Sequence, residues 1–213
     1  MGKSRLYTLA VPMPETYSQR AEKLVKFRIR GPRKGAKNEP ASAHSLRVGE
    51  LIQKHGYGEE VIIAAILHDI VEDGGMTFVQ LVAKGYTPRV IQIVKLCTHN
   101  KRVRNRDARW QLLVAGLVTA RDREAWAVKI ADVLDNFRSS KTLPRDRAAF
   151  FRGVKAPLVL NVSEDLMGKT AIWKELKREI EHSMSRALYH FVRKFFSLKA
   201  LDGVVGALKT PFI

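Results

Sequence analysis

The residues best suited to chemistry lie in one short and unusual segment of the sequence. Residues 67–74 read Leu-His-Asp-Ile-Val-Glu-Asp-Gly, which places four titratable side chains within six positions: His68, Asp69, Glu72 and Asp73. On a helix, His68 and Glu72 are i,i+4 and Asp69 and Glu72 are i,i+3, so the group would crowd one side of a helix end. Carboxylates at that end oppose the helix macrodipole and repel one another. A bound divalent cation would offset this repulsion.

A second carboxylate, Asp132, lies inside an apolar stretch, with Asn136 one turn later. A buried carboxylate needs a partner, and Lys129, an arginine or a metal ion would serve. His44, at the start of another apolar stretch, adds an imidazole. Taken alone, His44 is more simply read as a helix cap or a core histidine. Two imidazoles and two carboxylates together make a mixed nitrogen and oxygen site suited to manganese or iron, with zinc or cobalt as alternatives. Such metals polarise a phosphoryl oxygen and lower the pKa of a bound water.

The order of these residues resembles that of the HD superfamily of metal-dependent phosphohydrolases. The pattern of that superfamily is a histidine, then a His-Asp pair, then a distant aspartate; here these are His44, His68-Asp69 and Asp132. Longer matches narrow the resemblance to the ppGpp hydrolase domain of Rel/SpoT-type enzymes and to small alarmone hydrolases, over about residues 20–140. They are Leu67-His68-Asp69-Ile70-Val71-Glu72-Asp73, Lys129-Ile130-Ala131-Asp132 through Asn136, and Arg33-Lys34 with Pro40 before the first histidine.

The resemblance implies a role for each matching residue. The implied metal ligands are His44, His68, Asp69 and Asp132, usually holding Mn²⁺. Glu72 and Asp73 would be catalytic, orienting or deprotonating the attacking water, since a water beside a metal needs a nearby carboxylate to accept its proton. The implied substrate-binding residues are Arg33, Lys34 and Asn136, with Arg104 and Arg106 added as a phosphate clamp. The expected reaction converts guanosine-3′,5′-bis(diphosphate), or ppGpp, to GDP and pyrophosphate.

The sequence departs from the family pattern in three places. Ala41 stands where an aromatic residue is usual, Gly74-Gly75 stand where threonine follows the Val-Glu-Asp motif, and Asp135 stands where His or Tyr often precedes the final Asn. These changes leave the metal ligands intact and concern the recognition of guanine. An HD-type phosphohydrolase acting on another nucleotide is therefore the alternative substrate prediction.

The pattern of apolar residues predicts helices along nearly the whole chain, because no segment alternates with period two. The expected helices cover residues 42–55, 59–72, 77–84, 88–98, 106–119, 121–138, 145–165 and 169–197, and a long loop is expected at 29–41. The predicted fold class is all-α: an HD-domain helical bundle with a basic helical C-terminal extension. We assign residues 1–143 to the HD domain and 144–213 to the extension, packed on the same domain.

Charge and composition limit the partners. The chain has 38 Lys and Arg against 21 Asp and Glu, for a formal net charge of +17. This field attracts polyanions, either an anionic nucleotide substrate or a nucleic acid bound through the basic surface. A nucleic-acid-binding module on an inactive HD scaffold is thus the non-enzymatic alternative. No apolar run approaches the ~20 residues of a transmembrane segment. The single cysteine, Cys97, is typical of a reducing compartment, and we expect a cytoplasmic protein.

Overall fold

The computed structural model describes residues 15–33 and 39–183, and these residues confirm the all-α prediction. Their helices are α1 (Tyr17–Arg28), α2 (Ser42–Lys54), α3 (Glu59–Leu67), α4 (Phe78–Ala83), α5 (Pro88–Cys97), α6 (Arg106–Ala120), α7 (Arg123–Ser139), α8 (Arg145–Phe150), α9 (Ala156–Met167) and α10 (Ala171–Ser183). A 3-10 turn (Ser140–Thr142) follows α7, and a π-helical segment (Phe151–Lys155) joins α8 to α9. No strand occurs within the described ranges, where the extended pairing is a single bridge between Pro32 and Pro40.

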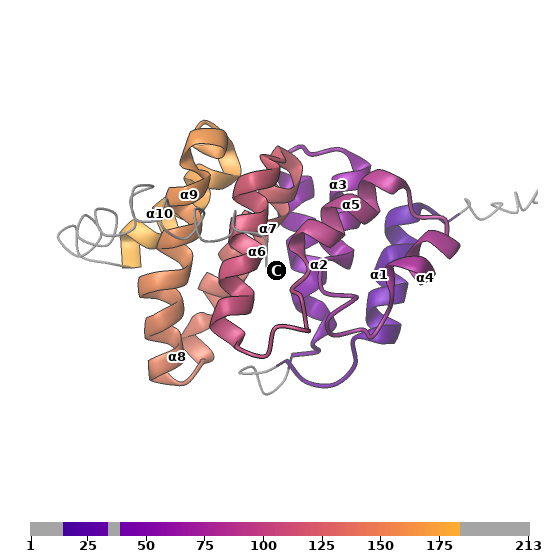
Figure 1. Ribbon diagram of the computed structural model, residues 1–213, viewed down its shortest axis with the longest axis horizontal. Coiled ribbons are helices and arrows are strands. Elements are labelled where there is room, and N and C mark those ends of the chain that lie inside the picture. The colour runs from indigo at the N-terminus through magenta and orange to yellow at the C-terminus, as the bar shows by residue number, and fades with distance from the viewer. Residues whose placement is uncertain (1–14, 34–38, 184–213) are drawn as a thin grey trace, which may run out of the picture.

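Helix α7 is the centre of the molecule. It packs against α2, α3 and α5 on one side and against α9 and α10 on the other, an arrangement visible in Figure 1. Its side chains are buried almost without interruption, and Trp126 and Phe137 are among the largest fully buried ones. One hydrophobic core therefore runs from α1 through α10. Burial of each large apolar side chain contributes ~1.5–3 kcal/mol, so this core holds α7 in place from both sides.

The start of α7 is set by Asp122. Its carboxylate caps the helix by accepting hydrogen bonds from the backbone N–H groups of Glu124 and Ala125, both at 3.0 Å. It also accepts two hydrogen bonds from Arg89 of α5, at 2.6 and 2.8 Å. A capping side chain satisfies backbone donors that have no partner within the helix. The cap and the ion pair together fix where the first turn of α7 lies relative to α5.

Helices α2 and α3 approach one another closely at Gly49. A Cβ atom at this position would lie 2.5 Å from Cγ1 of Ile66, whose side chain is buried. A glycine is therefore needed here, because any larger residue would push α3 away from α2. The contact places the first turn of α2, which carries His44, beside the C-terminal end of α3.

The helix predicted over residues 59–72 is shorter than expected. Helix α3 ends at Leu67, His68 is its C-cap, and residues 68–73 form tight turns, with a hydrogen bond from Ile70 N to Leu67 O at 2.9 Å. The chain then folds back, so that Met76 N donates to Ile70 O at 3.3 Å. Gly74 lies so close to this carbonyl that a Cβ atom would be 2.6 Å from it. The reversal around the fully buried Ile70 thus ends the helix early, and residues 68–72 lie in turns rather than in the predicted helix.

The ends of the described chain differ from the sequence-based pattern in two further respects. The pattern does not predict α1, which buries only Ala21 and Val25 and is started by a capping box between Thr16 and Gln19. The helix expected at 169–197 begins at Ala171, and its portion beyond Ser183 lies outside the described residues. Because α9 and α10 share their core with α7, the C-terminal helices pack on the same body as the rest. The boundary between residues 143 and 144 stays a prediction.

No helix in the described part of the chain combines the length and apolar character needed to cross a bilayer.

Candidate metal centre

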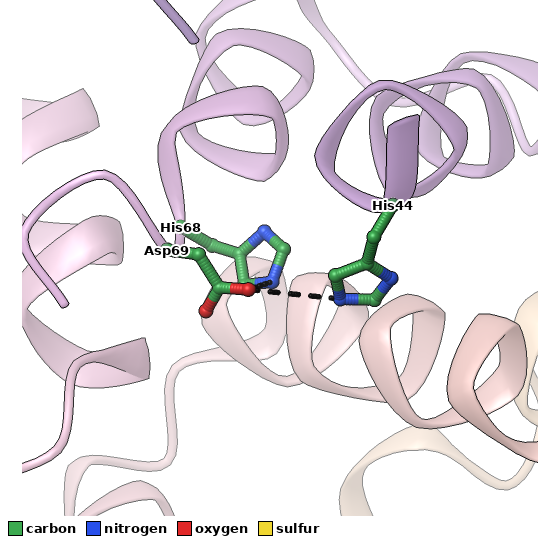
Figure 2. A group of neighbouring side chains, drawn as sticks. All are labelled: His44, His68 and Asp69. Carbon is green, nitrogen blue, oxygen red and sulfur yellow. Dashed lines mark ion pairs between the residues drawn. The ribbon is translucent and has the colours of Figure 1, made fainter. Parts of the chain in front are cut away.

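Two histidines and an aspartate from separate elements meet beside α7. His44 comes from the first turn of α2, while His68 and Asp69 follow the end of α3, and Figure 2 shows the three side chains converging. One potential ligand atom from each lies within 4.8 Å of the others. Asp69 Oδ2 lies 3.2 Å from Nε2 of His68 and 3.7 Å from Nε2 of His44. The turn that ends α3 therefore brings consecutive residues to the same point.

Asp132 of α7 completes the group. Its Oδ1 atom lies 3.1 Å from Nε2 of His44 and 3.9 Å from Nε2 of His68. Its Oδ2 atom accepts a hydrogen bond from the buried Lys129 ammonium at 2.7 Å, and Asn136 Nδ2 donates to Oδ1 at 2.5 Å. Of the partners considered from the sequence, Asp132 has Lys129, and it also faces the two imidazoles.

The orientation of His68 is what a metal ligand requires. Its Nδ1 donates to the carbonyl of Ala65 at 2.7 Å, so Nδ1 carries a proton and the neutral imidazole has its lone pair on Nε2. His68 is only 3% exposed, and its buried Nε2 makes no well-aligned hydrogen bond among the described residues, although Asp69 Oδ2 lies 3.2 Å from it. A buried polar atom left unsatisfied costs ~1–3 kcal/mol, and metal coordination through this lone pair would remove that cost. The residues present therefore fit a divalent cation held by mixed nitrogen and oxygen donors.

His44 is oriented by a second carboxylate on α7. Its Nδ1 lies 2.7 Å from Oδ2 of the buried Asp135, so Nδ1 donates and Nε2 points toward the cluster. Asp135 is held in turn by Arg47 and Arg33, whose guanidinium groups donate to it at 2.6 and 3.1 Å. A histidine that ligates a metal through one nitrogen commonly donates from the other to a carboxylate or carbonyl. Both histidines of the cluster have such a partner.

The charges of the cluster support one another. Burial opposes the charged form of His44, but hydrogen bonds to Asp132 and Asp135 outweigh it and raise the His44 pKa to about 9. Burial raises the pKa of Asp132, while Lys129 and the two imidazoles lower it well below its usual value. Burial likewise raises the pKa of Asp69 and His68 lowers it, with a net decrease. At neutral pH and without a metal, the carboxylates are therefore ionised and His44 is protonated, so a cation would bind by displacing the proton on Nε2 of His44.

A family model described as an HD domain matches residues 20–155. The chain belongs to the HD-domain family. This confirms the resemblance seen in the sequence.

Related proteins extend the HD-domain assignment. A guanosine-3′,5′-bis(diphosphate) 3′-pyrophosphohydrolase from Aquifex aeolicus (strain VF5) is 26% identical over 174 residues, which cover 80% of this chain and 24% of that protein. A probable GTP pyrophosphokinase from Mycobacterium leprae (strain TN) is 30% identical over 113 residues, covering 52% of this chain and 14% of that protein. The chain thus spans about a quarter or less of the length of these relatives.

Solved structures share the HD-domain fold. A structure described as a metazoan ortholog of SpoT that hydrolyzes ppGpp has a TM-score of 0.65 at 22% identity, covering 81% of this chain and 98% of that chain. The protein lmo0812 from Listeria monocytogenes EGD-e has a TM-score of 0.55 at 25% identity, covering 66% of this chain and 92% of that chain. The helical arrangement around the cluster is therefore one that solved structures share.

A cavity of about 620 Å³ adjoins the cluster of His44, His68, Asp69 and Asp132. Most of the sequence-predicted residues line it: His44, His68, Asp69, Asp132, Glu72, Asp73, Arg33, Asn136 and Arg106. Glu72 reaches it from the turn after α3 rather than from a helix face, and its carboxylate accepts hydrogen bonds from His99. Asp73 is exposed at the cavity.

The predicted substrate-binding residues divide into three groups. Arg33 lines the cavity, but its guanidinium already donates to Asp135 and, at 2.9 Å, to Oδ1 of Asn136. Arg106 lines the cavity at the start of α6, whereas Arg104 is not among the described residues that line it. Lys34 lies outside the described residues. The substrate roles of all of these residues stay predictions.

Several residues that line the cavity, or that hold residues lining it, were not predicted from the sequence. Asp135 lies three positions after Asp132 and thus on the same side of a helix, a signal that the spacing contained. Arg47 follows His44 by three positions in the same way. Nothing local pointed to His99, or to the wall formed by Trp110 and Lys155, where Lys155 Nζ lies 5.1 Å from the Trp110 ring. That lysine ends a π-helical segment, a feature frequent at functional sites.

Proposed function

We propose that this HD-domain protein is a metal-dependent phosphohydrolase that hydrolyses a nucleotide pyrophosphate. The proposed substrate is guanosine-3′,5′-bis(diphosphate), and the products are GDP and pyrophosphate. The observation that carries the proposal is the orphaned Nε2 of His68, which faces Asp69 and Asp132 at the wall of a cavity of about 620 Å³. Relatives whose names state a ppGpp pyrophosphohydrolase activity support the choice of substrate.

The proposed metal ligands are His44, His68, Asp69 and Asp132, and the proposed metal is Mn²⁺, with Fe, Zn or Co as alternatives. When bound, a divalent cation supplies Lewis-acid polarisation of a phosphoryl oxygen and lowers the pKa of a coordinated water. The protein contributes the orientation of the ligands. Asp135 and the Ala65 carbonyl hold the imidazoles of His44 and His68, so that both Nε2 atoms face the same point.

Glu72 is the residue that we propose accepts the proton of the attacking water, with Asp73 in support. Water attacks the phosphorus bonded to the 3′-oxygen, that P–O bond breaks, and the 3′-oxygen leaves as a hydroxyl after it receives the proton that Glu72 took from the water. Glu72 lines the cavity beside the proposed metal ligands and is partly buried. Its carboxylate is therefore close to the site of reaction and still accessible to water. A positioned general base contributes ~10²- to 10⁴-fold to such a reaction.

The substrate charge needs a basic wall, and the cavity has one. Arg106 and Arg109 of α6 and Lys155 of the π-helical segment line the side formed by the later helices. Two diphosphate groups carry several negative charges, and arginine and lysine side chains neutralise them as clamps and point charges. The net charge of +17 agrees with an anionic substrate. The proposal includes a cytoplasmic location, since a nucleotide substrate is found there.

The experiment is hydrolysis of ppGpp by the purified protein with Mn²⁺, with GDP and pyrophosphate separated by ion-exchange chromatography. His68→Ala and Asp69→Ala should lose bound metal and activity together. Asp165→Ala is the matched control, because Asp165 is an exposed carboxylate paired with Arg121 on the surface. If the protein hydrolyses another nucleotide but not ppGpp, the alternative prediction, an HD-type phosphohydrolase acting on that nucleotide, would replace this one.

Nucleic-acid binding by the basic surface stays a prediction. A binding module on an inactive scaffold would bind RNA or DNA with a steep salt dependence. That binding would not change in His68→Ala, whereas the enzyme would lose its activity.

A further inference from the structure

His99 holds the carboxylate of Glu72 through two donors. Its backbone N–H donates to Glu72 Oε1 at 2.7 Å. Its ring Nδ1 lies 2.8 Å from Oε1 and 3.0 Å from Oε2 of the same carboxylate. Because the partner is a carboxylate, Nδ1 is the donor and carries the proton. The carboxylate is thus held along its edge rather than at one atom.

The segment that carries His99 is itself fixed. Thr98 is the C-cap of α5, and its hydroxyl donates to the carbonyl of Val94 at 2.7 Å. This bond fixes the end of the helix immediately before His99. Beyond it, Lys101 Nζ donates to the backbone carbonyl of Glu72 at 2.6 Å. Residues 99–101 therefore hold both the side chain and the main chain of Glu72.

Glu72 and His99 lie in the wall of the cavity that the proposed metal ligands also line. Their side chains are 18% and 23% exposed. Glu72 follows α3 and His99 follows α5, two helices that pack against each other. A carboxylate has about four lone-pair positions. The three contacts with His99 therefore leave Glu72 able to accept a hydrogen bond from a water in the cavity.

We propose that His99 is a positioning residue, which fixes Glu72 in the orientation needed to accept the proton of the attacking water. The proposal rests on the role of Glu72 in the proposed function. Without the ring donor, a glutamate in a turn would sample other rotamers, and the carboxylate would spend less time beside the cluster. A shift of about 1 Å in such a group costs up to ~10²-fold in rate.

The first test compares His99→Phe with His99→Asn. Phenylalanine keeps the ring and the backbone donor but loses Nδ1, whereas asparagine keeps a side-chain donor near the position of Nδ1. We expect His99→Phe to lower kcat about 10- to 100-fold, with KM and metal content close to wild type, and His99→Asn to restore most of kcat. His182→Phe is the control, since His182 is an exposed histidine of α10 that contacts the carbonyl of Arg178. Wild-type kcat in His99→Phe, or equal losses in both variants, would overturn the proposal.

A second readout uses the metal-free protein and needs no substrate. A double-mutant cycle with Glu72→Gln and His99→Phe measures whether the two side chains interact in the folded state. A hydrogen bond to a charged group should appear as a coupling of about tenfold or more in the unfolding equilibrium constant. No coupling would overturn the proposal even if ppGpp is hydrolysed. Coupling in a protein that turns over another nucleotide would retain the role of His99 and reject only the ppGpp substrate, with kcat then measured on that nucleotide.

Discussion

His44 donates from Nδ1 to the carboxylate of Asp135 over 2.7 Å, and Asp135 lies one turn beyond Asp132 on α7. One helix therefore supplies a proposed metal ligand and also the group that orients another ligand. Asp135 is 4% exposed and is surrounded by the guanidinium groups of Arg33 and Arg47. Burial raises the pKa of Asp135, but the hydrogen bonds from His44 and Arg47 lower it by more than burial raises it, so Asp135 stays ionised.

Asp135→Asn should weaken metal binding while leaving every proposed ligand in place. An amide is a poorer acceptor than a carboxylate, and it can also present its NH₂ group to His44, which would turn the imidazole lone pair away from the cluster. We expect the Kd for Mn²⁺ to rise about 10- to 100-fold, as for other residues that orient a metal-bound histidine. Isothermal titration calorimetry on metal-free protein measures this, with the surface variant Asp165→Asn as the control. An unchanged Kd would show that Asp135 does not orient His44.

Arg106 and Arg104 make a matched test of the phosphate clamp. Both are exposed arginines near the start of α6, but only Arg106 lines the cavity. We expect Arg106→Gln to raise KM for ppGpp about tenfold with little change in kcat, because it removes one charge-assisted contact to a phosphate. Arg104→Gln should leave both constants near the wild-type values. Steady-state kinetics on the two variants decide the question, and equal effects would mean that general charge, rather than position, matters.

Glu175 should make the attachment of α10 sensitive to acid. Its carboxylate accepts from Lys54 and His55 at the end of α2 and from Arg138 of α7. Burial raises its pKa, but Arg138 and Lys54 lower it to about 2, from an ordinary value of 4.5. Because the folded-state pKa is depressed, the ion pairs stabilise the protein fully above pH 4.5, and this contribution is lost as the pH falls toward about 2.

The variant Glu175→Gln tests that assignment. At pH 7 it should lower the free energy of unfolding by about 1–3 kcal/mol, the cost of losing hydrogen bonds to charged groups. The difference between variant and wild type should shrink as the pH is lowered from 5 toward 2. Urea unfolding at several pH values measures this, with Glu50→Gln, at an exposed position of α2, as a comparison for the removal of one negative charge. A difference that does not vary with pH would contradict the ion-pair origin of the effect.

Gly49→Ala should destabilise the contact between α2 and α3. The added Cβ would lie 2.5 Å from Cγ1 of the buried Ile66, and such overpacking costs ~1–3 kcal/mol. The control is Gly116→Ala in α6, where a Cβ meets no atom within 4 Å. Because alanine forms helices better than glycine does, Gly116→Ala should raise the free energy of unfolding by ~0.5–1 kcal/mol. Chemical unfolding that gave the same sign for both variants would refute the steric explanation.

The sequence by itself determined the fold class and the family. Apolar residues at helical spacing predicted most of the helices, because burial of one face repeats with the turn of the helix whatever the tertiary contacts are. His44, His68-Asp69 and Asp132 were recognisable because their order along the chain is a family pattern, and the structure brings all four together. Asp135 could also have been identified from the sequence as a neighbour of Asp132, because the two lie three positions apart on α7.

Only the tertiary structure decided how the site is completed. The reversal of the chain around Ile70 ends α3 at Leu67, and Glu72, in the turn that follows, contacts His99. The contact of Glu72 with His99 joins positions 27 residues apart, and no local periodicity encodes such a distance. Arg33 is likewise drawn into hydrogen bonds with α7 instead of standing free in the cavity. Local spacing specifies which groups share a helix face, but packing between helices selects which faces meet, and it is this selection that builds the cavity.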